Sequence, residues 1–246
     1  MPAARRVALS SVLGLILGLT AVLASPADSS VPFPGSEACF GSAVTIYGTD
    51  GADHITGTPG NDVIWAGDGD DVIDGGDGKD RICAGGGHDI VYGGRGNDHI
   101  ISGDGGATIF GGSGSDRIFV SSDVDNAPDV DTDSVVRAGK GDDFVYPLSG
   151  NDAIHGGSGH DHIGFFGASP AITIDLAAGT LSTAGYTSSV AGIEDVTGGG
   201  GDDIIRGDEN DNRLVSWYGT DLIDGRGGHD RCAGTHVVNC EAKAKP

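Results

Sequence analysis

An aliphatic residue recurs at every ninth position between residues 48 and 164. From Gly48 the chain divides into thirteen units of nine residues that end at Gly164, and position eight is Ile or Val in all of them except the unit with Ala127. Successive side chains of a strand point to opposite faces, so a three-residue strand centred on position eight turns one aliphatic side chain inward. The pattern predicts a stack of short strands around a thin core. The core positions are Ile55, Ile64, Ile73, Ile82, Val91, Ile100, Ile109, Ile118, Val136, Val145, Ile154 and Ile163.

The polar positions between these strands predict tight turns. Position four is Gly in eleven units, and position six is Asp in eleven, failing at Ala107 and Ser134. Glycine permits the positive φ values of a tight turn, and we expect the aspartate to close each turn facing outward. The stretch 120–137 is two units long and has lost most of the pattern. Because the register is kept across it, we expect it to continue as coils of the same solenoid.

Units such as GGRGNDHII at 93–101 and GGSGSDRIF at 111–119 match the pattern G-G-x-G-x-D-x-U-x, in which U is aliphatic. The chain therefore resembles the repeats-in-toxin (RTX), or haemolysin-type calcium-binding, family over these thirteen units and over a later block of four. The resemblance implies an all-β fold, a right-handed parallel β-roll solenoid with a strand-rich insertion. In such a roll six residues make a turn, three make a strand, and two units complete one coil.

The same resemblance implies calcium sites between the turns. Calcium prefers about six to eight oxygen ligands, and a glycine turn offers carbonyl oxygens beside the position-six carboxylate. Two units per coil place turns eighteen residues apart on one edge, where a pair of turns holds one ion. The implied metal ligands are Asp53, Asp62, Asp71, Asp80, Asp89, Asp98, Asp116, Asp143, Asp152, Asp161, Asp203, Asp221 and Asp230.

The eighteen-residue spacing assigns these ligands to pairs. On one edge the expected pairs are Asp53/Asp71, Asp71/Asp89 and Asp143/Asp161. On the opposite edge they are Asp62/Asp80, Asp80/Asp98 and Asp98/Asp116. In the later block Asp203/Asp221 is intact, whereas Asn212/Asp230 has lost one charge. Sites that involve Ala107 or Ser134 are expected to be weak or empty.

Composition agrees with a chain that needs cations. It has 36 acidic and 14 basic residues, a net charge of −22, and 46 glycines with only 9 prolines, which excludes collagen. Such a charge argues against nucleic acid and anionic membrane as partners. Stacked carboxylates repel one another, so we expect calcium binding and folding to be coupled. The alternative is a solvated acidic surface that binds no specific ion.

The N-terminus predicts export. Arg5 and Arg6 precede an apolar run over 7–24, and small residues follow, so residues 1–27 are expected to be a signal peptide. The expected location is secreted or extracellular, including the cell surface, with no membrane insertion after cleavage. A retained membrane anchor is the alternative, and Sec and twin-arginine export both stay open.

Four cysteines in an exported chain suggest two disulfides, for which three connectivities exist. Pairing Cys39 with Cys83 and Cys232 with Cys240 is the local choice, and free buried thiols are the alternative. The expected segments are an N-terminal cap over 28–47, the roll over 48–164, an insertion over 165–197, a second repeat block over 198–233 and a C-terminal cap over 234–246.

The insertion breaks the nine-residue rhythm because its 33 residues are not a multiple of nine. Ile172, Ile174 and Leu176 lie on one face of a β-type run. The phrase I-E-x-V-x-G at 193–198 is similar to the end of such interruptions in haemolysin-type proteins. We expect longer coils that continue the solenoid.

Catalytic patterns are missing from the sequence. It contains no H-E-x-x-H and no G-x-S-x-G, and the one histidine cluster, 160–162, includes an aspartate already assigned to calcium. The expected function is therefore a non-enzymatic calcium-binding protein with a structural or surface role. One alternative is an adhesion or carbohydrate-binding module with a polysaccharide partner, in which Trp217 and Tyr218 stack on sugar instead of covering an edge. The other is an accessory or diverged region of a calcium-dependent extracellular hydrolase.

Overall fold

The computed structural model describes residues 38–120, 133–147, 150–165, 170–183 and 185–243. All the regular elements in these ranges are strands. None of the described residues forms a helix long and apolar enough to cross a membrane. The predicted signal peptide over 1–27 and the first ten residues of the predicted cap over 28–47 lie outside these ranges, so both stay predictions.

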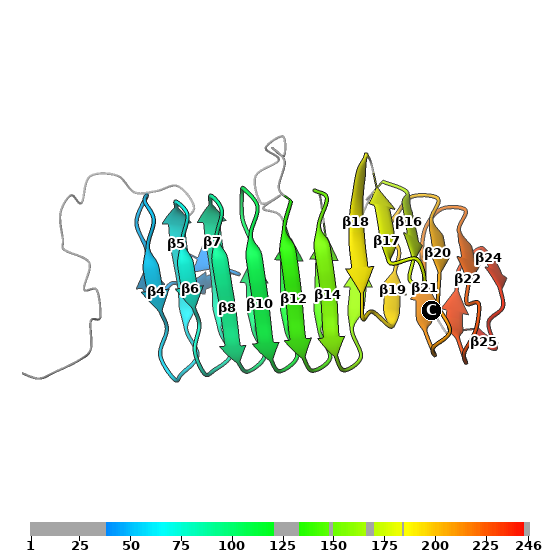
Figure 1. Cartoon of the computed structure of the whole chain (residues 1–246), viewed down its shortest axis with the longest axis horizontal. Helices are drawn as coiled ribbons and strands as arrows, with labels where there is room; N and C mark the ends of the chain where they lie inside the picture. Colours follow the sequence, from blue (N-terminus) through cyan, green and yellow to red (C-terminus); the bar gives the residue numbers. More distant parts are fainter. Residues whose placement is uncertain (1–37, 121–132, 148–149, 166–169, 184, 244–246) are drawn as a thin grey trace, which may run out of the picture. The chain divides into compact units, whose positions relative to one another are not determined.

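The strands form two long sheets, and Figure 1 shows successive coils side by side with their turns along two edges. The twelve-stranded sheet has the order β24 (His236–Val238), β22 (Leu222–Asp224), β20 (Ile204–Arg206), β16 (Ile172–Asp175), β17 (Thr180–Thr183), β18 (Tyr186–Ala191), β14 (Ala153–Ser158), β12 (Val135–Lys140), β10 (Thr108–Ser113), β8 (Ile90–Arg95), β6 (Val72–Asp74) and β4 (His54–Thr56). The eleven-stranded sheet has the order β25 (Ala242–Lys243), β23 (Arg231–Ala233), β21 (Arg213–Val215), β19 (Asp195–Thr197), β15 (His162–Gly164), β13 (Phe144–Pro147), β11 (Arg117–Val120), β9 (His99–Ile101), β7 (Arg81–Gly86), β5 (Val63–Asp68) and β3 (Ile46–Tyr47).

Parallel pairing at eighteen-residue spacing confirms the predicted β-roll. Ile55 lies opposite Ile73 in one sheet, and Ile64 lies opposite Ile82 in the other. The twelve predicted aliphatic positions are all buried. The core is slightly wider than expected, because Ala66, Ala84 and Ala138 at position one of their units are also fully buried.

The expectation that 120–137 supplies two further half-coils is wrong for one of them. Ile109 of β10 pairs with Val136 of β12, and Ile118 of β11 pairs with Val145 of β13. Both separations are 27 residues, or three units, so one nine-residue unit contributes no strand between these neighbours. If successive units alternated between the two sheets without a break, every unit after this point would lie in the other sheet from the one it occupies. Residues 121–132 lie outside the described ranges.

The insertion adds strands to one sheet only. β16, β17 and β18 all join the twelve-stranded sheet, β17 runs antiparallel to both neighbours, and only β19 joins the other sheet. It continues the solenoid as expected, but by an antiparallel excursion in place of longer coils. Ile172 and Ile174 are buried, and Leu176 packs against the core.

Both predicted disulfides are confirmed. Cys39 of the hairpin formed by β1 (Ala38–Cys39) and β2 (Ser42–Ala43) is bonded to Cys83 of β7, and Cys232 of β23 is bonded to Cys240. The predicted C-terminal cap continues the roll by one strand in each sheet, β24 and β25.

Candidate metal centre

The position-six aspartates form two columns, one along each set of turns. In the long column the backbone N–H of each aspartate donates to Oδ1 of the aspartate in the next coil, over 2.8–2.9 Å. The long column consists of Asp62, Asp80, Asp98, Asp116, Asp143 and Asp161. The interrupted column consists of Asp53, Asp71, Asp89, Ala107, Ser134 and Asp152. The prediction that these carboxylates face outward is wrong, because all of them except Asp53 are at least 94% buried.

The second carboxylate oxygen is the unusual feature of these columns. Within the part of the chain that the structure describes, a set of buried Oδ2 atoms accepts no hydrogen bond. They belong to Asp71, Asp80, Asp89, Asp98, Asp116, Asp143, Asp161 and Asp230. An ionised oxygen buried without a partner is costly, so a row of them indicates a missing cation.

In other residues of the columns this oxygen accepts hydrogen bonds from the protein itself. In the first coil Asp62 Oδ2 accepts from the Thr58 backbone N–H and hydroxyl at 2.6 and 2.9 Å. Asp53 has the same two contacts with Thr49. Where Asn212 replaces aspartate, its amide nitrogen donates to the Glu194 carbonyl and its oxygen accepts from the Asp208 N–H. The unpartnered oxygens therefore belong to turns that lack such a donor.

Carbonyl oxygens lie around the same points. A Cβ added to Gly93 lies 2.8 Å from Asp98 Oδ2 and 2.5 Å from the carbonyl oxygen of Gly111 in the next coil. Gly75 has the equivalent neighbours, Asp80 Oδ2 and the Gly93 oxygen, at 2.9 and 2.6 Å. Among the described residues no three His, Cys, Asp or Glu side chains converge, so a metal here needs these carbonyls as ligands. A mixture of carboxylate and carbonyl oxygens fits calcium.

Burial makes the charged form of these carboxylates unfavourable. Desolvation, with smaller contributions from neighbouring carboxylates, raises the pKa of Asp80 and Asp161 to about 6, against a lowering effect of the backbone hydrogen bonds. The pKa of Asp89 is likewise raised to about 6, and that of Asp116 to about 7. A bound cation removes this penalty, because an opposite charge nearby favours the ionised form.

The skipped unit changes which turns are neighbours. Asp143 and Asp161 stack as expected, but in the long column and not beside Asp53, Asp71 and Asp89. Asp116 therefore meets Asp143, a pair that the eighteen-residue spacing does not assign. Ala107 lies against Ser134, and the Ala107 N–H donates to Ser134 Oγ at 3.1 Å. Both defective turns thus fall in the interrupted column, and the long column stays intact.

The other predicted pairs are also neighbours. The N–H of Asp203 donates to Asp221 Oδ1 at 3.2 Å, and that of Asn212 donates to Asp230 Oδ1 at 2.9 Å. Asp203 differs from the inner repeats because its Oδ2 accepts from the Ser216 hydroxyl. The N–H of Asp152 donates to Ser188 Oγ, so no carboxylate follows it in the interrupted column.

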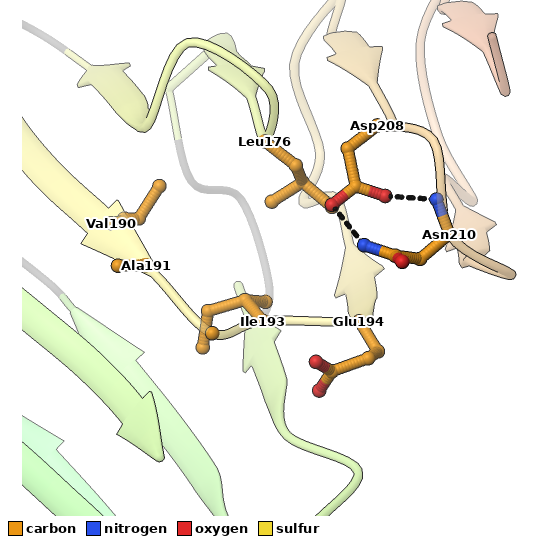
Figure 2. A pocket seen from close by; sticks show the side chains of 8 residues that line it. Leu176, Val190, Ala191, Ile193, Glu194, Asp208 and Asn210 are labelled. Carbon is orange, nitrogen blue, oxygen red and sulfur yellow. Dashed lines mark hydrogen bonds between the residues drawn. The ribbon is translucent and has the colours of Figure 1, made fainter. Parts of the chain in front are cut away.

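A hollow of about 140 Å³ opens where the insertion rejoins the roll (Figure 2). It is lined by Leu176 and residues 190–194 on one side and by Asp208 and Asn210 on the other. Asp208 accepts from both the backbone and the side-chain amide of Asn210, which fixes this turn. The hollow lies beside Glu194.

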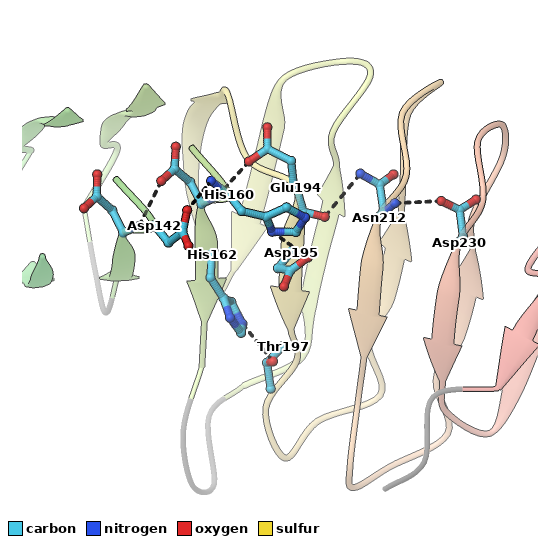
Figure 3. A network of polar contacts seen from close by, with 10 residues as sticks. Asp142, His160, His162, Glu194, Asp195, Thr197, Asn212 and Asp230 are labelled. Atoms are coloured by element: carbon cyan, nitrogen blue, oxygen red, sulfur yellow. Dashed lines mark hydrogen bonds and ion pairs between the residues drawn. The ribbon is translucent and has the colours of Figure 1, made fainter. Parts of the chain in front are cut away.

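Glu194 occupies the next place in the long column, where sequence reasoning assigned no ligand. Its Oε2 accepts from the Asp161 N–H at 2.8 Å, the contact that aspartates make elsewhere (Figure 3). The I-E-x-V-x-G phrase was recognised, but as the end of an insertion. Its glutamate is a position-six residue because β19 pairs with β15, which places Asp195 opposite His162.

The remaining candidate residues behave differently from the columns. His162 Nε2 lies 2.9 Å from Thr197 Oγ1, and burial lowers the pKa of His162 to about 4, so its ring is neutral. Trp217 and Tyr218 are 50% and 70% exposed, and the expectation that they cover an edge stays a prediction.

Comparison with known families agrees with this geometry. A family model described as RTX calcium-binding nonapeptide repeat (4 copies) matches residues 47–82, 74–109, 84–118, 108–126, 131–163 and 191–232. These segments cover more than half of the chain, and the last one includes Glu194. No curated protein matches the chain.

Proposed function

The chain belongs to the RTX calcium-binding nonapeptide repeat family, and we propose that it is a secreted, non-enzymatic protein whose roll folds around calcium ions held between stacked turns. The row of buried Oδ2 atoms without hydrogen-bond partners carries this proposal. Calcium supplies the positive charge that these oxygens lack. Neighbouring turns hold their carboxylates and carbonyls one coil apart and keep water away from them.

The proposed ions lie between neighbouring position-six residues. The proposed pairs are Asp53/Asp71, Asp71/Asp89, Asp62/Asp80, Asp80/Asp98, Asp98/Asp116, Asp116/Asp143, Asp143/Asp161 and Asp203/Asp221. Residues 1–27 carry two Arg and no acid, so the exported chain has a formal net charge of −24, which eight divalent ions reduce to −8. This neutralisation removes most of the repulsion that opposes a compact roll. Asp152 and Asp230 each lack a charged neighbour in the preceding coil and are proposed as weaker ligands.

Export and a non-catalytic role rest on separate observations. Disulfides persist in oxidising compartments, and the described chain has two of them and no free cysteine. The proposed signal peptide over 1–27 gives the route out of the cell. The carboxylates of the long column bond neighbouring coils to one another, which supports the proposed structural role. The proposed organisation of the chain is an N-terminal cap over 28–47, the roll over 48–164, the insertion over 165–197, the second repeat block over 198–233 and the C-terminal cap over 234–246.

Far-UV circular dichroism during a calcium titration tests the proposal. The purified protein is stripped of metal with a chelator and titrated with calcium, and with magnesium as the control. A coil-to-β transition at about 10⁻⁴–10⁻³ M calcium, the range of extracellular modules, that magnesium does not reproduce is the expected result. A β-signal that is the same with and without chelator at neutral pH overturns the proposal.

The exposure of Trp217 and Tyr218 favours a second candidate function, carbohydrate binding. Two large aromatic side chains on one turn offer the flat apolar surfaces on which sugars stack. Pull-down on insoluble cell-wall polysaccharide tests this, with Trp217→Ala and Tyr218→Ala as variants. Equal retention of the variants and the wild type contradicts it.

A further inference from the structure

The long column does not end with the nine-residue repeats. Asp161 is the last aspartate of the first repeat block, and it is 99% buried. Its Oδ2 has no hydrogen-bond partner among the described residues, like that of Asp98 or Asp116 inside the block. In those inner turns the next coil supplies a second carboxylate. At Asp161 the next coil supplies Glu194, 33 residues later.

The turn before Glu194 is unusually short. In a regular unit six residues link the end of one three-residue strand to the start of the next, as residues 156–161 link His155 to His162. Between Ala191, which pairs with His155, and Asp195, which pairs with His162, there are only three residues. The hollow in Figure 2 lies beside this shorter turn, which lines one side of it.

A glutamate compensates for this shorter turn. Its side chain is one methylene, about 1.5 Å, longer than that of aspartate. The extra length lets Oε2 reach the Asp161 N–H at 2.8 Å, the distance that Asp80 Oδ1 keeps from the Asp62 N–H. The column therefore keeps its spacing across the seam between the two repeat blocks.

The other oxygens of a repeat site are also present at the seam. A Cβ added to Gly156 lies 2.6 Å from Asp161 Oδ2 and 2.0 Å from the Gly192 carbonyl oxygen. These are the same two kinds of neighbour that surround Gly93 within the repeats. Gly192 thus stands in the place of the position-one residue of the next coil.

Further groups at the seam explain why the column stops there. Asn212 follows Glu194 in the column, and its amide nitrogen donates to the Glu194 carbonyl (Figure 3). Its amide oxygen accepts from the Asp208 N–H. Asp195, next to Glu194, lies 3.5 Å from His160 Nδ1 and points to that exposed imidazole and not to the column. Asn212 brings no charge and leaves no oxygen unpartnered, so the last site of this run is the one between Asp161 and Glu194.

We propose that Asp161 and Glu194 hold a further calcium ion, which joins the first repeat block to the second. The proposal rests on the proposed function, because it needs the inner pairs to bind calcium as well. The seam ion bridges β15 and β19 at the point where the other sheet carries the antiparallel insertion. It therefore makes the two blocks fold as one unit.

Calcium stoichiometry of three variants tests the seam site. Glu194→Gln keeps the length and the hydrogen-bond acceptor but removes the charge, and Glu194→Asp keeps the charge but shortens the reach. Glu209→Gln, an exposed acid of the turn over 207–212, is the matched control. Equilibrium dialysis is expected to give one ion fewer per molecule for both Glu194 variants and no change for the control. Calcium-dependent folding of the two blocks is expected to separate into two transitions in the Glu194 variants.

Each outcome separates this inference from the proposed function. A wild-type protein that binds no calcium overturns both. A wild-type protein that binds calcium, with an unchanged number of ions in Glu194→Gln, overturns the seam site alone. Retention of the ion in Glu194→Asp overturns the argument from side-chain reach. If Glu194→Gln does not fold, anomalous scattering from wild-type crystals grown in calcium decides, and no peak between Asp161 and Glu194 refutes the site.

Discussion

Removal of calcium at neutral pH is expected to unfold the roll, and acid is expected to restore it. The buried carboxylates without a cation have a folded-state pKa above the ordinary value of 3.8, about 6 for Asp80, Asp89 and Asp161 and about 7 for Asp116. A group whose pKa is raised on folding binds its proton more tightly in the folded state. Its penalty is absent below pH 3.8, grows as the pH rises and is complete above the folded pKa.

The magnitude is comparable with the stability of a whole domain. One pKa unit corresponds to about 1.4 kcal/mol, so the three groups near 6 cost about 3 kcal/mol each and Asp116 costs about 4 kcal/mol. Together they disfavour the calcium-free roll at neutral pH by on the order of 13 kcal/mol. Typical domains have a free energy of unfolding of about 5–15 kcal/mol. The calcium-free roll is therefore expected to be most stable near pH 4, to have lost about half of this free energy by pH 5 and to be unfolded at pH 7.5.

Circular dichroism of the chelated protein between about pH 3.5 and pH 8 measures this dependence, with a calcium-saturated sample as the control. The net charge approaches zero near pH 4.3, which favours aggregation, so the protein is kept at low concentration. The β-signal is expected to fall between about pH 4 and pH 7 without calcium and to stay constant with it. A calcium-free β-signal that is independent of pH, or that rises with pH, refutes the reasoning.

Three further substitutions test separate parts of the structure. Asp116→Asn is expected to remove two ions, measured by equilibrium dialysis, because Asp116 is shared by two pairs of the long column. It is also expected to stabilise the calcium-free roll by about 2 kcal/mol in urea unfolding of the chelated protein at pH 5.5. Gly93→Ala is expected to lower the free energy of unfolding by about 1–3 kcal/mol in urea with calcium present, because the added Cβ lies 2.5 Å from a carbonyl oxygen. Gly51→Ala is expected to be neutral, because its added Cβ has nothing within 4 Å. Equal effects of the two variants contradict the packing argument. Removal of the disulfide in Cys39→Ser/Cys83→Ser is expected to cost about 4 kcal/mol for a separation of 44 residues, and an unchanged midpoint in the same assay contradicts it.

The sequence predicted the roll because its signal is local and repeated. An aliphatic residue at position eight and a glycine at position four define a strand and a turn in every unit, independently of the rest of the chain. Burial of the carboxylates was not predictable in the same way. Asp98 is polar, so it was expected to face outward, yet its Oδ1 bonds to the coil below, and only neighbouring coils bury it.

The pairing of turns across 120–137 depends on a second period that the sequence does not display. Units repeat every nine residues, but successive units alternate between the two sheets, so neighbours in one sheet are two units apart. Omission of one unit keeps the nine-residue period and exchanges the sheets to which all later units belong. Hydrophobic patterning is therefore identical whether Asp116 meets Ser134 or Asp143. Only the strand pairing, Ile118 against Val145, decides between them. The pairing that forms keeps the carboxylates of the long column together and leaves Ala107 against Ser134. If calcium drives folding as we propose, this arrangement is favoured because it joins Asp116 to Asp143 in a complete site. The unbroken alternation places Asp116 opposite Ser134, which has no carboxylate, and Asp143 opposite Asp125, whose turn has no glycine at position four.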